Sequence, residues 1–232
     1  MQHIDDTKLY NDGQYRFDYV ADFMEFGETD IKAIQAVAEQ VRPLIPVVVD
    51  AVYKKLFTYD VTKRFFLPKN EGFEGETATT LEALTLDHPQ IKFRKDFLSR
   101  YLNKLLDGPY DDRFLRYLDW VAKIHTDTPQ KKSKINVDYI HVNCLMGYVE
   151  STLVGGLLSL HLDRDTEAKA LAAFNKLLWI QNDYFAKYYA LPSNQIKEPS
   201  SFSSLTGPHV LSTMMGTLIG GLAVYFGFIK RS

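Results

Sequence analysis

Helical spacing of apolar residues is the feature that most constrains what this chain folds into. Apolar side chains recur every three or four positions in five or six segments between residues 29 and 191, whereas strand-like alternation never lasts beyond a few residues. Proline or glycine punctuates these segments, as at Pro43, Pro46, Pro89 and Gly108. The pattern predicts an all-α domain whose helices are joined by mostly short loops.

Composition excludes several classes of protein. A net charge of −2 provides no basic field for nucleic acid, so we expect no nucleic-acid partner. The single cysteine, Cys144, excludes an internal disulfide and any multi-cysteine metal site, and it indicates a reducing compartment. Because Cys144 lies within an apolar helical run, we expect its thiol to be buried. The chain also lacks the nucleotide-binding, zinc-protease and serine-hydrolase signatures.

Composition shifts divide the chain into four parts. Residues 1–28 form an N-terminal extension, in which charges interrupt any apolar run of signal-peptide length. Residues 29–191 carry the helical segments of the main domain. Residues 192–208 are rich in Ser, Pro, Asn and Gln, which is typical of a linker. Residues 209–232 contain an apolar run and a short basic tail.

That apolar run predicts a transmembrane helix. Val210 opens and Ile229 closes twenty uncharged residues, and a helix of this length spans about 30 Å, the thickness of a bilayer core. A buried helix is the alternative. Gly216 and Gly220 form a small-residue pair that permits close helix pairing, so a homodimer is one expectation. Because only three residues follow the run, we expect a tail anchor inserted after synthesis, with the helical domain facing the cytosol.

Two residues stand out as candidates for chemistry. His125 follows the apolar face of its helix, which carries Phe114, Leu118, Val121 and Ala122. Haem iron requires such an imidazole in an apolar crevice, with its other ring nitrogen hydrogen-bonded. From spacing alone, a core histidine remains the alternative, and His141 is a rival ligand. Tyr53 either packs as a core ring or donates a hydrogen bond to a bound gas.

The order of anchor residues resembles the protoglobin and globin-coupled-sensor family. The resemblance extends from about Tyr15 to Leu191. It rests on Val52-Tyr53, then Phe65-Phe66, then Ser99-Arg100-Tyr101, then the helix from Tyr110-Asp111 to His125, and then Val137-Asp138-Tyr139.

The resemblance implies a globin fold with an added N-terminal segment and a haem b cofactor whose iron binds O₂, CO or NO. By that correspondence His125 is the proximal iron ligand and Tyr53 the distal tyrosine. The residues that would wall the haem are Phe97, Leu98, Tyr101, Leu145 and Val149. The chain departs from globin-coupled sensors because a linker and a membrane tail, rather than a transmitter domain, follow the globin part.

Three functions fit these residues. The first is a haem-binding globin that senses or stores a diatomic gas at a membrane surface, and we favour this one. The second is a haem redox enzyme, an NO dioxygenase or a peroxidase-like protein. The third is a haem-free, membrane-tethered interaction module with the same core pattern.

Overall fold

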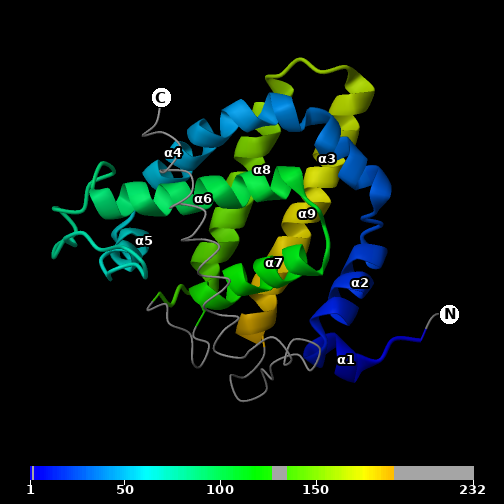
Figure 1. Cartoon of the computed structure of the whole chain (residues 1–232), viewed down its shortest axis with the longest axis horizontal. Coiled ribbons are helices and arrows are strands. Elements are labelled where there is room, and N and C mark those ends of the chain that lie inside the picture. Colours follow the sequence, from blue (N-terminus) through cyan, green and yellow to red (C-terminus); the bar gives the residue numbers. More distant parts are fainter. Residues whose placement is uncertain (2, 127–134, 191–232) are drawn as a thin grey trace, which may run out of the picture.

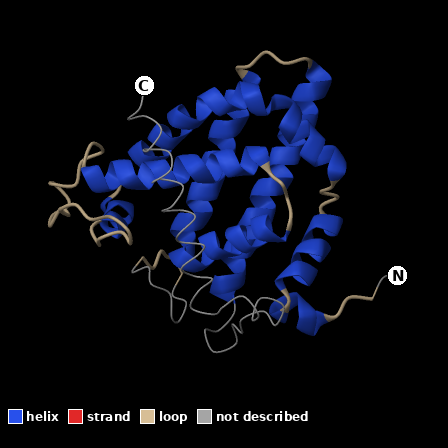
Figure 2. Ribbon diagram, viewed as in Figure 1, coloured by secondary structure: helices blue, strands red, loops and turns tan. Residues whose placement is uncertain are grey.

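The computed structural model describes residues 1, 3–126 and 135–190, and the regular elements of these residues are all helical (Figure 2). The elements in chain order are α1 (Asp6–Asn11), α2 (Gly13–Phe23), α3 (Glu28–Val41), η1 (Arg42–Leu44), α4 (Ile45–Leu56), α5 (Asp60–Lys63), η2 (Arg64–Phe66), α6 (Pro89–Asp107), α7 (Asp112–His125), α8 (Tyr139–Leu158) and α9 (Arg164–Ala190). The predicted all-α class is confirmed.

Local signals explain where the main helices begin and end. Asp111 caps α7 by accepting hydrogen bonds from the backbone N–H groups of Arg113 and Phe114, each at 3.0 Å. Pro89 is the first residue of α6, as its position predicts. Helix α3 ends before Pro43, but no loop follows, because the 3₁₀ turn η1 leads directly into α4.

Helix α9 forms the centre of the domain. It packs against α3, α8 and α7, and it carries more buried residues than the other described helices, among them Phe174, Leu177 and Ile180. On α3 the apolar residues that recur at helical spacing form the inward face, since Ile34, Val37, Ala38 and Val41 are buried there. Burial of this continuous apolar face is the main favourable term that holds the bundle together.

Helix α8 is less central than its composition suggests. An apolar segment over about residues 137–160 predicts a helix buried on most sides, yet only Val142 and Leu157 of α8 are fully buried. Ile140, Val154 and Leu158 are exposed, and so is Cys144, which lies one turn after Ile140. The prediction of a buried thiol is therefore wrong, because a helix that is apolar all round does not indicate which of its faces the core covers.

The N-terminal extension is part of the folded domain. Asp5 and Asp12 cap α1 and α2, neither of which the apolar spacing predicts. Helix α2 packs on α7 and α9, and the Arg16 guanidinium donates to both carboxylate oxygens of Asp183 on α9, at 2.7 and 2.6 Å. This two-point ion pair joins the beginning of the chain to its last described helix.

The membrane prediction concerns a different part of the chain. None of the helices in residues 1–126 and 135–190 is long and apolar enough to cross a bilayer. The run from Val210 to Ile229, its Gly216 and Gly220 pair and the 192–208 linker lie outside the described residues, so they stay predictions.

Candidate functional site

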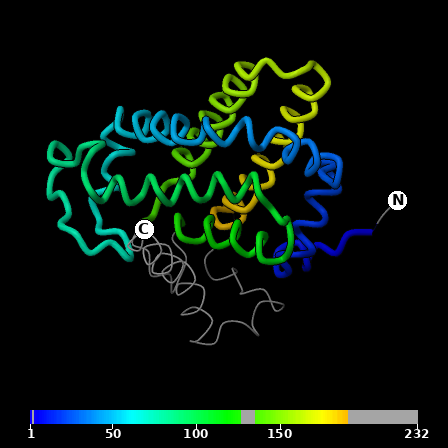
Figure 3. The backbone as a smooth tube through the Cα atoms, turned by 45° about the horizontal axis from the view of Figure 1, so that its top comes forward, coloured from blue at the N-terminus to red at the C-terminus, as the bar shows by residue number. Residues whose placement is uncertain are grey.

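Helices α6 and α7 are consecutive and antiparallel, but they are held apart. Both Figure 1 and Figure 3 show α6 between α4 and α7. Helix α6 packs on α3 and α4, and α7 packs on α9 and α2, whereas α6 and α7 are not among the described helix pairs whose backbones pack closely. Because a short connection usually brings two helices into direct contact, the separation means that side chains, rather than close backbone contacts, line the space between them.

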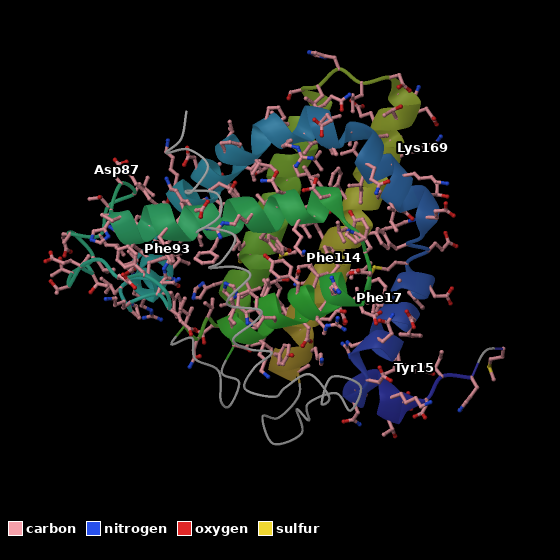
Figure 4. All side chains as sticks on the ribbon, viewed as in Figure 1. Tyr15, Phe17, Asp87, Phe93, Phe114 and Lys169 are labelled. Atoms are coloured by element: carbon pink, nitrogen blue, oxygen red, sulfur yellow. The ribbon has the colours of Figure 1, made fainter. Side chains whose placement is uncertain are left out.

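Aromatic rings occupy this space, and we call them the aromatic layer. Its members are Phe93, Phe97 and Tyr101 on α6 and Tyr117 and Trp120 on α7. The Phe93 and Phe97 rings meet edge to face with centroids 4.9 Å apart, the Tyr101 and Tyr117 centroids are 6.2 Å apart, and the Tyr117 and Trp120 rings stack at 6.0 Å. Figure 4 shows Phe93 on the side of α6 toward α7. These rings are only half-buried or exposed, so they offer apolar surface to a flat cofactor.

His125 has the tautomer that a metal ligand requires. It is the last residue of α7, and its Nδ1 lies 2.7 Å from the carbonyl oxygen of Val121. Because a carbonyl only accepts, Nδ1 must carry the proton, so Nε2 is the nitrogen with a lone pair whenever the ring is neutral. The ring is half-buried and meets Phe185 edge to face at 5.8 Å. An imidazole whose Nδ1 is bonded to a carbonyl, in apolar surroundings, fits a residue that would hold a haem iron through Nε2.

A buried ion pair fixes the helix that carries His125. Asp119 on α7 accepts from Lys187 Nζ at 3.0 Å and from the Tyr188 hydroxyl at 2.7 Å, both on α9. Lys187 is 5% exposed, which is rare for a lysine. Sequence reasoning missed this cluster, although a lysine between the aromatic residues Phe185 and Tyr188 indicates a charge on a buried face of the helix.

Tyr53 belongs to α4, which lies on the other side of α6 from α7 (Figure 1). It is buried on α4, which packs on α6, and its ring centroid lies 5.5 Å from that of Phe66. Burial raises the pKa of the Tyr53 hydroxyl well above its usual range, while the nearby charge of Arg94 acts in the opposite direction. The hydroxyl therefore remains protonated, and it remains a hydrogen-bond donor, at every physiological pH.

Two buried polar residues of α6 lie near Tyr53, and sequence reasoning missed them. Gln90 donates from Nε2 to the carbonyl oxygens of Phe66 and Pro68, at 2.6 and 3.0 Å. Arg94 donates from Nη2 to the same Pro68 oxygen at 2.9 Å. Ile91 lies one turn before Arg94, so a charged residue within an apolar stripe was the sign available in the sequence.

The predicted wall residues lie in three different places. Phe97 and Tyr101 belong to the aromatic layer, and the Tyr101 hydroxyl donates to Gln181 Oε1 at 2.9 Å. Leu98 and Leu145 are half-buried against the core. Val149 lines an apolar cavity of about 50 Å³ between α3, α4, α6, α8 and α9. That cavity is too small for a porphyrin, and neither His125 nor Tyr53 lines it.

The rival ligand lies elsewhere. His141 is in the first turn of α8, and its ring meets Phe65 edge to face with centroids 5.8 Å apart. It is on neither of the helices that carry the aromatic layer. Its position therefore favours His125 over His141 as the ligand.

Known proteins resemble this chain in sequence pattern and in fold. The protoglobin family model matches residues 13–194. The solved globin domain of a Geobacter sulfurreducens globin-coupled sensor superposes with a TM-score of 0.56 at 16% identity, over 75% of this chain and 97% of that domain. A search of curated proteins found no match. The superposition shows that the helical bundle has a globin-like arrangement.

Proposed function

Because the chain belongs to the protoglobin family, we propose that it binds haem b between α6 and α7 and reversibly holds a diatomic gas. The gas is O₂, CO or NO, and sensing or storage is the role. The hydrogen bond from His125 Nδ1 to the Val121 carbonyl carries the proposal, because it leaves Nε2 as the ligating atom. The aromatic layer supports it by providing rings on both facing helices.

Each residue has a distinct role in this proposal. Haem, when bound, supplies an iron with an open coordination position for the gas. His125 would hold that iron from the α7 side, and its ring meets that of Phe185 edge to face. Phe97 and Tyr101 exclude water from the α6 side. Tyr53 presents a neutral hydroxyl that donates a hydrogen bond to a ligand with partial negative charge.

The test of the proposal is the absorption spectrum of the full chain. We expect added haem to give an absorption band more intense than that of free haem. Reduction and CO should shift the wavelength of this band. A chain that stays colourless while circular dichroism shows a folded helical protein would contradict haem binding, and it would favour the haem-free module.

Removing the Tyr53 hydroxyl tests the distal role. Tyr53→Phe keeps the ring and its packing on Phe66, so we expect O₂ to dissociate about three- to tenfold faster, as one lost hydrogen bond implies. CO dissociation should change less, since CO attracts a hydrogen bond more weakly. Stopped-flow spectroscopy measures both rates.

Tyr59→Phe is the matched control for Tyr53→Phe. Tyr59 is 49% exposed and follows α4 in the chain, so its loss should leave both gas dissociation rates unchanged. Equal rates in Tyr53→Phe and in the unmodified protein would contradict a distal role for Tyr53.

The proposed location is a membrane surface. It rests on the uncharged run from Val210 to Ile229 and on the basic residues Lys230 and Arg231 that follow. The gas-binding proposal does not depend on it, because His125, Tyr53 and the aromatic layer all belong to residues 1–190.

A further inference from the structure

Arg94 is a buried cation that has no anionic partner among the residues that the structure describes. Arg94 is only 7% exposed, and its Nε has no hydrogen-bond partner among the described residues. Its described hydrogen bond goes to a neutral group, the Pro68 carbonyl. Burial lowers the pKa of the guanidinium to about 10, so Arg94 stays charged at neutral pH. An unpaired buried charge is unfavourable, which indicates that something outside the described chain neutralises it.

The surroundings of Arg94 are positive as well. Its guanidinium lies 5.2 Å from the ring centroid of Phe66, the same ring that packs against Tyr53. Lys95 Nζ lies 6.0 Å from the centroid of the Tyr53 ring, and the carboxylate that pairs with it, Asp50, is 70% exposed. Solvent screens that carboxylate. Two cationic side chains, Arg94 and Lys95, therefore lie close to the Phe66 and Tyr53 rings.

Gln90 adds an unused acceptor at the same place. The residue is fully buried, and its Oε1 has no hydrogen-bond partner in the described part of the chain, although its Nε2 is bonded to two carbonyls. Two residues one helical turn apart on α6 thus each have a buried polar atom without a partner in the described chain. The atom on Arg94 is a donor, and the atom on Gln90 is an acceptor. A small anion accompanied by a water molecule would satisfy both.

We propose that Arg94 and Tyr53 form a subsite for a small monovalent anion, of the size of azide, nitrite or formate. The proposal rests on the proposed function, since it assigns the subsite to the distal side of the haem. The guanidinium provides a planar set of N–H donors that suits a flat or linear anion, and the Tyr53 hydroxyl is a further donor. A carboxylate of the porphyrin is the other anion that could pair with Arg94, and haem dimethyl ester, which has no such charge, separates the two.

The test compares a charged ligand with a neutral one. In the ferric haem-loaded chain, we expect Arg94→Met to weaken azide binding by about 10- to 100-fold, the effect of losing a hydrogen bond to a charged group. In the ferrous chain, CO affinity should change less than about threefold, because CO carries no net charge. Arg94→Lys keeps the charge without the planar donors and should give an intermediate loss of azide affinity.

Arg113→Met is the matched control, since Arg113 is exposed in the first turn of α7. It should leave azide affinity unchanged. Unchanged azide affinity in Arg94→Met would overturn the proposal, and so would an equal loss of azide and CO affinity, which would mean general distortion. Faster haem loss from Arg94→Met that disappears with haem dimethyl ester would assign Arg94 to a porphyrin carboxylate and overturn it too.

A second measurement does not need haem. In the haem-free full chain, replacing sodium gluconate by sodium azide at constant ionic strength should raise the unfolding temperature of the unmodified and Arg113→Met proteins. It should not raise that of Arg94→Met. A chain that binds no haem but shows this difference would contradict the proposed function alone, whereas a haem-binding chain without it would contradict the anion subsite alone.

Discussion

Replacing His125 by alanine should abolish the haem absorption band of this chain or change it to that of loosely held haem. The variant removes the only ligand that the proposal assigns to the iron, so haem affinity should fall by more than the 10- to 100-fold typical of a lost outer-shell partner. The fold should survive, because His125 is half-buried at a helix end and the described hydrogen bond of its ring is within its own helix. We expect that substitution to cost about 1 kcal/mol of unfolding free energy.

Imidazole rescue and a second histidine make this test specific. Free imidazole should enter the space left in His125→Ala and restore the band, because it supplies the same nitrogen without the chain. His141→Ala should keep the spectrum of the unmodified protein. A normal spectrum in His125→Ala, or a lost band in His141→Ala, would contradict the assignment of His125 as the iron ligand.

Local signals predicted much of the helical architecture. The limits of α6 and α7 follow from Pro89, from the glycine after Asp107 and from the Asp111 cap, all of which act within a few residues. The inward face of α3 follows from its period, because one stripe of apolar residues can be buried in only one way. These elements carry the aromatic layer and His125, so the helices that hold these residues were predictable from the sequence, whereas the role of His125 rests on the family resemblance.

Contacts between distant residues were not accessible in this way. The ion pair that ties α2 to α9 joins Arg16 to Asp183, which are 167 positions apart, and no local pattern records it. Gln90 and Arg94 reach back 22 to 26 positions to Phe66 and Pro68. The anion subsite consists of such contacts, so it became visible only with the three-dimensional structure.

Asp119→Ala should destabilise the fold more than any of the substitutions at His125, Tyr53 or Arg94. It leaves Lys187 buried without its carboxylate partner and leaves the Tyr188 hydroxyl without the oxygen that accepts from it at 2.7 Å. Breaking a buried pair from one side costs about 3–5 kcal/mol, because the remaining charge stays desolvated. For a domain of this size that corresponds to a fall of roughly 10 °C in the unfolding temperature, measurable by circular dichroism.

The same network should also affect the position of His125, because Asp119 attaches α7, the helix that ends in His125, to α9. Asp165→Ala is the matched control: its pair with Lys169 spans one turn at 2.5 Å and its side chain is 73% exposed, so its loss should cost less than about 1 kcal/mol. Asp119→Leu combined with Lys187→Met removes both charges and should recover much of the stability lost in Asp119→Ala. Equal unfolding temperatures for Asp119→Ala and Asp165→Ala would mean that the buried pair does not hold α7 in place, and the rigidity assigned to His125 would then need another source.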